Sequence, residues 1–185
     1  MSHNGSRPDI DIIRQLVDRK RKEFESQLML HDRDIAKRLK QLGVDEVENK
    51  PSIKEEFIDL PDGADVSKLS DDQIGRKHFG AGIWLGYVKT QCTIEDVKRT
   101  VAKEARDGAL ADALISAEGG SVDDRRAIAS RDPVYRAWNS VYITHLSMYK
   151  RLNTLCETWE SRVGLYSREI TLRTALANAE SNKFS

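Results

Sequence analysis

Histidine and carboxylate side chains are the first candidates for chemistry in this chain of 185 residues. The histidines are His3, His31, His78 and His145, and none of them stands in a Ser, Cys or carboxylate arrangement that predicts a catalytic pair. His145 falls on an apolar helical face, which favours a core residue over a general base. The Asp and Glu residues gather in expected linkers, which indicates solubility rather than acid–base chemistry. We therefore expect a protein that is not an enzyme.

Basic side chains give the stronger candidate site, here called the basic stripe. Lys98, Arg99, Lys103 and Arg106 spread over one side of an expected helix, and Lys89 extends that side towards its start. A cationic stripe backed by a helical bundle can follow a phosphate backbone. The alternative is a solvated face in which neighbouring acidic residues pair with these cations. The sequence leaves both interpretations open.

Aromatic residues lie beside the basic stripe. Phe79, Trp84 and Tyr87 come just before it, and exposed rings next to phosphate-binding cations would form a stacking platform for single-stranded bases. Trp84 is the ring that we expect to act in this way. The predicted DNA-binding set is therefore Lys89, Lys98, Arg99, Lys103, Arg106 and Trp84.

Metal and cofactor sites are not predicted. Cys92 and Cys156 have no Cys or His at metal-ligand spacing, and we expect reduced core thiols rather than a disulfide or a metal site. Gly75, Gly80 and Gly82 could form a phosphate-cradling loop, but they lack the Walker spacing and its Lys-Ser/Thr. A flexible lead-in to a helix is the favoured interpretation.

The charge is balanced overall but unevenly distributed. The chain has 30 Lys plus Arg and 30 Asp plus Glu. Counting along the sequence gives net +3 for residues 1–42, −7 for 43–72, +4 for 73–106, −3 for 107–132 and +3 for 133–185. The neutral total therefore describes solubility and does not exclude a nucleic-acid partner.

The N-terminal third is predicted to be one helix followed by a linker. Apolar residues keep mostly three-and-four spacing from Pro8-Asp9 to Leu42, where Gly43 ends the pattern. This narrow stripe needs a partner helix, from this chain or from another copy. Residues 43–72 are acidic and poor in large apolar groups, which predicts a flexible linker. A short segment around Ile53–Ile58 could dock as a peptide.

A second helix is expected from about Phe79 to Leu114, ending before Gly119-Gly120. Its first third could instead be a short strand at Ile83–Val88. A lone strand would have no sheet to join, so we prefer the continuous helix.

The last third carries the clearest periodicity. Ser121 is predicted to cap a short helix, and Asp132-Pro133 to begin a long one. That long helix has an apolar seam with four-and-three spacing, and most of the seam is predicted to mediate oligomerisation. The predicted oligomerisation residues are Trp138, Tyr142, Tyr149, Leu152, Trp159, Val163 and Ile170.

Together these patterns predict an all-α protein. Long antiparallel helices form a helical hairpin or coiled-coil core, preceded by an amphipathic helix and an acidic linker. The expected organisation is a helix over 1–42, a linker over 43–72, a DNA-binding and oligomerisation core over 73–178 and a tail over 179–185. No apolar run approaches the roughly 18–20 residues that span a bilayer, and a cytoplasmic location is expected.

The order of features in about residues 76–178 resembles the UvsY-type recombination mediators of phages. The resemblance rests on Trp84-Leu85, the cations Lys98 to Arg106, the Gly119-Gly120 loop and the start Asp132-Pro133-Val134-Tyr135. Glu160-Ser161-Arg162 and Leu165-Tyr166-Ser167-Arg168 add to it near the end. Residues 1–72 have no counterpart in the family.

This resemblance implies a non-enzymatic protein that binds single-stranded DNA. It also implies that the chain forms ring-like homo-oligomers and helps to load a RecA-like recombinase onto DNA coated with single-strand-binding protein. If the chain is phage-encoded, this would take place in the infected host cell. The rival hypothesis is a coiled-coil scaffold or assembly protein of a phage particle, in which the same helical seams serve self-association without a nucleic acid.

Overall fold

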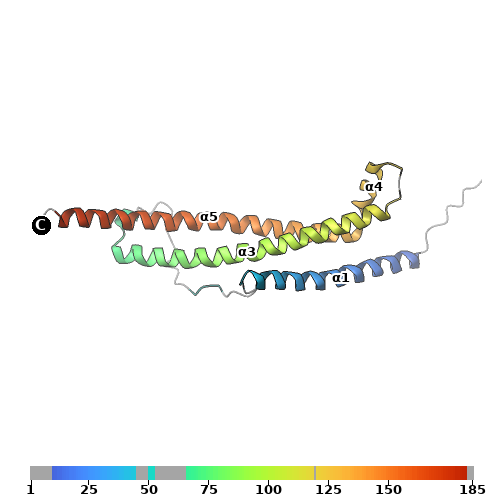
Figure 1. Ribbon diagram of the computed structural model, residues 1–185, viewed down its shortest axis with the longest axis horizontal. Helices are drawn as coiled ribbons and strands as arrows, with labels where there is room; N and C mark the ends of the chain where they lie inside the picture. The colour runs from blue at the N-terminus through green and yellow to red at the C-terminus, as the bar shows by residue number, and fades with distance from the viewer. Residues whose placement is uncertain (1–9, 45–49, 53–65, 119, 183–185) are drawn as a thin grey trace, which may run out of the picture. The chain divides into compact units, whose positions relative to one another are not determined.

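The computed structural model describes residues 10–44, 50–52, 66–118 and 120–182. The helices are α1 (Ile10–Gln41), the short 3-10 helix η1 (Val66–Lys68), α3 (Asp71–Ser116), α4 (Val122–Ala129) and α5 (Pro133–Ser181) (Figure 1). No strand occurs in these ranges, so the all-α prediction is confirmed and the strand alternative at Ile83–Val88 is wrong. α5 also extends to Ser181, past the expected beginning of the tail.

The second helix begins earlier than its periodicity indicated. α3 starts at Asp71 because Ser70 and Gln73 form a capping box. The Gln73 backbone N–H donates to Ser70 Oγ at 3.3 Å, and the Ser70 N–H donates to Gln73 Oε1 at 2.9 Å. The glycine-containing stretch over 73–82 is therefore helical and is not a flexible lead-in or a phosphate loop.

The predicted linker over 43–72 also contains ordered structure. Residues 66–68 form η1, and Val66 is buried in a core cluster. The segment Ile53–Ile58, considered above as a docking peptide, lies outside the described residues.

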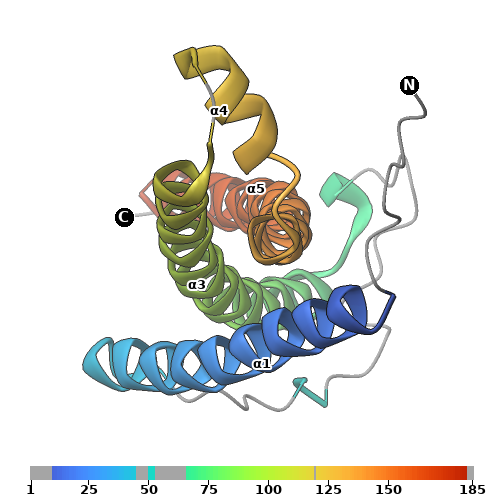
Figure 2. The same ribbon diagram turned by 90° about the vertical axis from the view of Figure 1, so that its right-hand side faces the viewer.

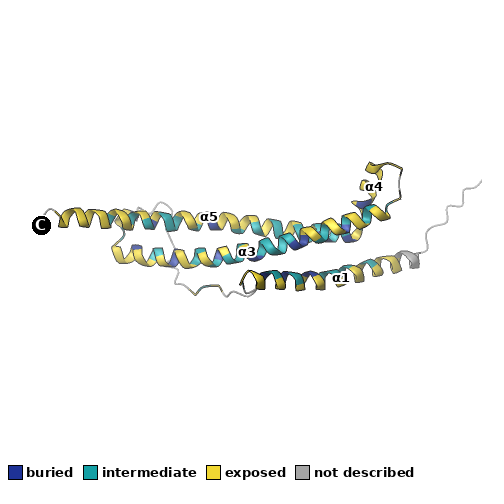
Figure 3. Ribbon diagram, viewed as in Figure 1, coloured by how far each residue is buried: buried dark blue, intermediate teal, exposed yellow. Residues whose placement is uncertain are grey.

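Contacts divide the chain into two compact units. The first unit combines Met1–Val44 with Glu95–Ser147, and the second combines Asp45–Ile94 with Met148–Ser185. Both α3 and α5 therefore contribute to each unit. Exposed residues cover most of the helical surface, and buried positions are few on each helix (Figure 3).

The first unit contains α1, α4, the last part of α3 and the beginning of α5 (Figure 2). Its core is Trp138, which is 0% exposed and packs with Ala109 and Val134. Phe24 of α1 meets the Trp138 ring edge-on at a centroid distance of 5.2 Å. The partner that the stripe of α1 requires therefore comes from this chain. Burying a tryptophan removes roughly 200 Å² from water, worth about 5 kcal/mol before entropy costs.

The caps expected at two helix starts in this unit are confirmed. Ser121 Oγ accepts the Asp124 backbone N–H at 3.0 Å at the start of α4. Asp132 Oδ1 accepts the N–H groups of Val134 and Tyr135 at 2.8 and 3.0 Å, which begins α5. Both caps satisfy backbone donors that the first turn of a helix leaves without partners.

The second unit is a hairpin of the first part of α3 and the last part of α5, with η1 beside it. Its two helices run antiparallel. Asp71 near the start of α3 pairs with Arg173, whereas Lys89 farther along α3 pairs with Glu160, which comes earlier on α5. The core contains one aromatic residue and three smaller apolar residues, with further apolar side chains packed against it. These buried residues are Val66, Ile74, Ala81 and Tyr166.

Candidate functional site

The basic stripe is divided between the two units. Lys98, Arg99, Lys103 and Arg106 belong to the first unit, whereas Lys89 belongs to the second. Arg99, Lys103 and Arg106 are spaced by four and three residues, so they share one face of α3 and are here called the basic row. Lys98 precedes Arg99 directly and therefore lies about 100° around the helix.

Carboxylates of the same helix pair with most of these cations. Lys98 Nζ lies 3.5 Å from Glu95 Oε1, and Arg99 donates to Asp96 Oδ1 at 2.6 Å. Both are pairs three residues apart, which are readily made on a helix surface. These pairs are partly buried, since the side chains of Lys98 and Glu95 are 25% and 15% exposed, and a phosphate group must displace the carboxylate to reach either cation.

The remaining members of the basic row have different environments. Lys103 is exposed and forms no ion pair with any residue that the structure describes. Arg106 donates to Asp107 Oδ1 at 2.6 Å, and its guanidinium carbon lies 4.3 Å from the centroid of the Tyr142 ring on α5. This cation–π contact fixes the arginine next to an aromatic surface. Tyr142, predicted as an oligomerisation residue, thus contacts a predicted DNA-binding residue of the same chain.

Lys89 forms an interhelical ion pair in the second unit. Its Nζ lies 2.7 Å from Glu160 Oε1 of α5, and both side chains are about half exposed. The hydrogen bond with Glu160 raises the pKa of Lys89. Lys89 therefore links α3 to α5 through this ion pair.

Trp84 is engaged inside the second unit. Its ring stacks on Trp159 at a centroid distance of 6.0 Å and an interplanar angle of 12°, and Tyr87 meets it edge-on at 5.6 Å. Lys50 Nζ lies 5.3 Å from the centroid of the Trp84 ring. Because Trp159 covers one face of the Trp84 ring, Trp84 does not offer both faces to a base. Phe79, in contrast, is 69% exposed.

The predicted oligomerisation seam is used largely inside the chain. Trp138 is completely buried in the first unit, and Trp159 and Val163 pack against the core of the second. Tyr149 and Leu152 are half-buried, and Ile170 is 38% exposed. The seam is buried within the chain because apolar residues of α3 pack against it, in place of a helix from another copy.

A different apolar surface of α5 remains exposed. Leu165, Leu172 and Leu176 are 43%, 54% and 57% exposed and are here called the leucine row. Spacings of seven and four residues place them on one side of the helix. Leu165 directly precedes the buried Tyr166, so this side differs from the core-facing one. The leucine row is not among the residues predicted above, although its heptad-like spacing is visible in the sequence.

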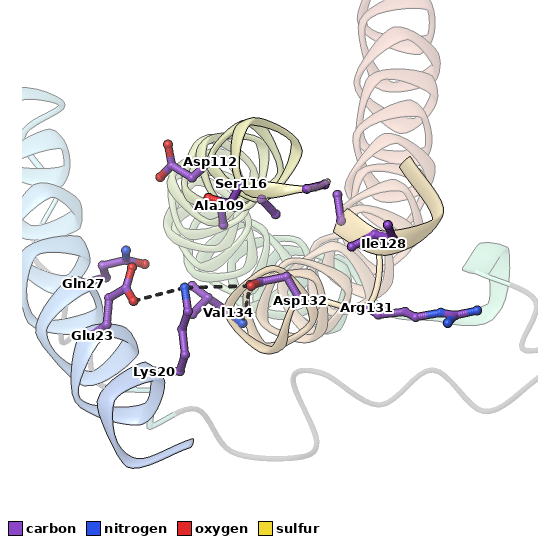
Figure 4. Close-up of a pocket in the computed structure, with 13 residues that line it drawn as sticks. Lys20, Glu23, Gln27, Ala109, Asp112, Ser116, Ile128, Arg131, Asp132 and Val134 are labelled. Atoms are coloured by element: carbon purple, nitrogen blue, oxygen red, sulfur yellow. Dashed lines mark hydrogen bonds and ion pairs between the residues drawn. The ribbon is translucent and has the colours of Figure 1, made fainter. Parts of the chain in front are cut away.

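A cavity of about 430 Å³ lies in the first unit between α1, α3, α4 and the start of α5 (Figure 4). Charged groups of both signs line it. Lys20 Nζ lies 3.4 Å from Glu23 Oε2 and 3.9 Å from Asp132 Oδ2, while Asp132 also caps α5. Lys20 therefore connects α1 to the residue that caps α5 at the edge of this cavity.

Two histidines lie near the core of the first unit. His31 is 6% exposed, its ring centroid is 4.8 Å from that of Trp138, and neither ring nitrogen has a hydrogen-bond partner among the described residues. Burial lowers the pKa of His31, although the nearby Asp32 opposes this effect. His145 is half-buried, and its Nδ1 lies 2.8 Å from Glu95 Oε2 on α3. Both histidines therefore contribute to packing between helices.

Comparisons with known proteins give no assignment. No protein-family model, curated protein or solved structure matches this chain. Within the described ranges, no group of three or more His, Cys, Asp or Glu residues is placed to hold a metal ion. The described helices also include none with the length and apolar character needed to cross a membrane.

Proposed function

We propose that this chain binds single-stranded DNA without catalysing a reaction, as a recombination mediator. In this role it helps to load a RecA-like recombinase onto strands coated with single-strand-binding protein. The observation that carries the proposal is the basic row, which places three cations on one face of α3 and leaves Lys103 without an ion pair to any described residue. The resemblance to UvsY-type mediators supplies the recombinase and the single-strand-binding protein as partners.

The geometry of the row determines how such binding would work. Residues 99–106 extend over roughly 10 Å at 1.5 Å per residue, so one protomer contacts few phosphates. Because DNA phosphates must replace the carboxylate partners of Arg99 and Arg106, the affinity per protomer is modest. Oligomerisation then raises the overall affinity by presenting several rows to one strand.

Charge removal with a matched control tests this proposal. The test variant replaces Arg99, Lys103 and Arg106 with alanine. The control replaces Arg33, Lys37 and Lys40, which are exposed on α1 of the same unit with the same spacing. Fluorescence anisotropy with labelled oligo-dT at several salt concentrations measures affinity.

The test variant should bind more weakly, and the slope of log affinity against log salt should fall by about 2, as expected for three lost contacts with a single strand. The control should retain the steeper slope. Equal losses in the two variants would show that overall charge, and not the basic row, determines binding.

A second candidate function is self-assembly as a structural scaffold, and the exposed leucine row favours it. Three leucines on one side of a long helix match the narrow apolar seam of a coiled coil. On this hypothesis, Leu165, Leu172 and Leu176 contact another copy.

Sedimentation velocity tests the second candidate. Changing the leucine row to glutamine should reduce the size of the oligomer. A control with Leu16, Leu30 and Leu42 changed to glutamine removes two exposed leucines from α1 and a third that directly follows it. An oligomer that is smaller in the control, or unchanged in the test variant, would contradict this assignment. DNA binding by the wild-type protein distinguishes the mediator from a scaffold.

A further inference from the structure

The two cysteines of the chain meet in the second unit. Cys92 on α3 and Cys156 on α5 are separated by 64 positions in the sequence, yet their thiols lie within hydrogen-bonding distance of each other. Both are free thiols; Cys156 is 8% exposed and Cys92 is partly exposed. The helical hairpin therefore places a dithiol between its two arms.

Neighbouring contacts hold the two thiols on facing turns. Lys89 lies one turn before Cys92, and Glu160 lies one turn after Cys156, and these two charged residues form the 2.7 Å ion pair between the helices. The stacked pair Trp84–Trp159 joins the same two segments. The thiols are thus kept in register by polar and aromatic contacts on neighbouring turns.

We propose that Cys92 and Cys156 form a redox modification site that closes to an intramolecular disulfide by exchange with a small disulfide of the glutathione class. The Cys92 thiolate attacks one sulfur of oxidised glutathione, forms a mixed disulfide and releases one glutathione thiolate. The Cys156 thiolate then attacks the Cys92 sulfur and expels the second glutathione. The protein loses two hydrogen atoms, and one glutathione disulfide is reduced to two glutathiones.

The order of attack follows from the surroundings of each thiol. Cys92 reacts first because it is the more accessible of the two. Burial raises the pKa of Cys156, and the nearby Glu160 and Glu157 act in the same direction, whereas the hydrogen bond with Cys92 and the charge of Lys89 oppose them. The second step is therefore the slow one, and it accelerates as the pH rises and more of the Cys156 thiolate forms.

Closure would fix α3 to α5 within the second unit. The bond closes a long loop of the chain, and such cross-links stabilise a protein mainly by restricting its unfolded state. Reduction by an excess of a small thiol reverses the bond. The site would thus make the strength of the hairpin depend on the redox state of its surroundings.

Oxidation of the native full-length chain tests the proposal. The protein is incubated with oxidised glutathione and quenched with acid, and its intact mass and unreduced peptide map are then measured. The expected product is a single covalent chain lighter by two hydrogen atoms, with the Cys92 and Cys156 peptides joined. Its Tm should rise by roughly 5–10 °C and return on reduction.

Single cysteine variants test the order of the two steps. Cys156→Ser should accumulate a glutathione adduct on Cys92, while Cys92→Ser should remain largely unmodified in the native state. A wild-type chain that retains a stable adduct on Cys92, forms disulfides between chains, or stays unmodified under conditions that oxidise the unfolded chain would overturn the proposal.

Discussion

The two units use tryptophans at equivalent seam positions in different ways. Trp138 and Trp159 are 21 residues apart on α5, which corresponds to three heptads. Trp138 is enclosed by residues of α1, α3 and α5, whereas Trp159 packs within a hairpin and stays partly exposed. The comparison shows that a third helix turns an aromatic seam residue into a closed core.

In each unit, an arginine also joins segments distant in sequence through hydrogen bonds. In the first, Arg38 of α1 donates to both carboxylate oxygens of Glu104 on α3, at 3.2 and 2.6 Å. In the second, Arg173 of α5 donates to Asp71 at 2.6 Å and to the carbonyl oxygen of Ser67 at 3.0 Å. These hydrogen bonds raise the pKa of each arginine. Polar anchoring is thus similar in the two units, and the apolar packing is what differs.

The largest expected effect comes from removing the enclosed tryptophan. Trp138→Ala should destabilise the chain by about 3–5 kcal/mol, because it leaves a cavity and removes the partner of the Gln27 side chain, which accepts the indole N–H at 2.8 Å. Trp159→Ala should cost about 1–3 kcal/mol, since its ring is already partly hydrated. Urea unfolding followed by circular dichroism measures both. Equal losses would contradict the difference between a closed core and an open hairpin.

Much of the fold could be predicted from local signals. Periodicity indicates the long helices, and Ser121 and Asp132 mark two helix starts because their side chains can accept backbone N–H groups. The start of α3 was missed because its capping box, Ser70 with Gln73, sits at the end of an acidic stretch that lacks apolar periodicity. The partner of α1 could not be predicted, since a helical stripe defines a face but not what covers it.

The candidate site was predictable to a smaller extent. The basic residues could be placed on one helix from the sequence, with acidic neighbours as possible partners, and the pairs Lys98–Glu95 and Arg99–Asp96 follow from their spacing alone. Contacts between α3 and α5 depend on how the two helices are aligned along their length, and local sequence patterns do not determine this register. The stacking of Trp84 on a ring of α5 is such a contact.

Lowering the pH should have an intermediate effect on stability, and the first unit, which contains His31, should respond more than the second. Because the pKa of buried His31 is lowered from 6.5, the folded chain resists its protonation. Its contribution to stability is complete above pH 6.5 and is lost as the pH falls towards its folded-state pKa, at no more than about 1.4 kcal/mol per pH unit.

Hydrogen exchange at about pH 7.5 and about pH 5.5, corrected for intrinsic rates, measures this effect. Protection of α1 should fall at the lower pH, and His31→Leu should reduce that loss, while η1 in the second unit serves as the reference. An unchanged pH response of α1 in the variant would exclude His31 as its source.

The smallest effects should follow from changing the two anchoring arginines to lysine. Lysine keeps the charge but cannot donate to two oxygens in a fixed fork. Arg38→Lys should accelerate amide exchange in the last turns of α1, and Arg173→Lys should accelerate it at Val66–Lys68, with little change in Tm for either. Acceleration of both segments by either variant would show that the two units open together rather than separately.

Binding of single-stranded DNA by the wild-type protein tests the central claim most directly. Purified full-length protein is titrated with fluorescent oligo-dT and with a duplex of equal length, at low and at moderate salt. We predict a preference for the single strand and an affinity that falls steeply as salt is added. Absence of binding to oligo-dT at low salt would contradict it.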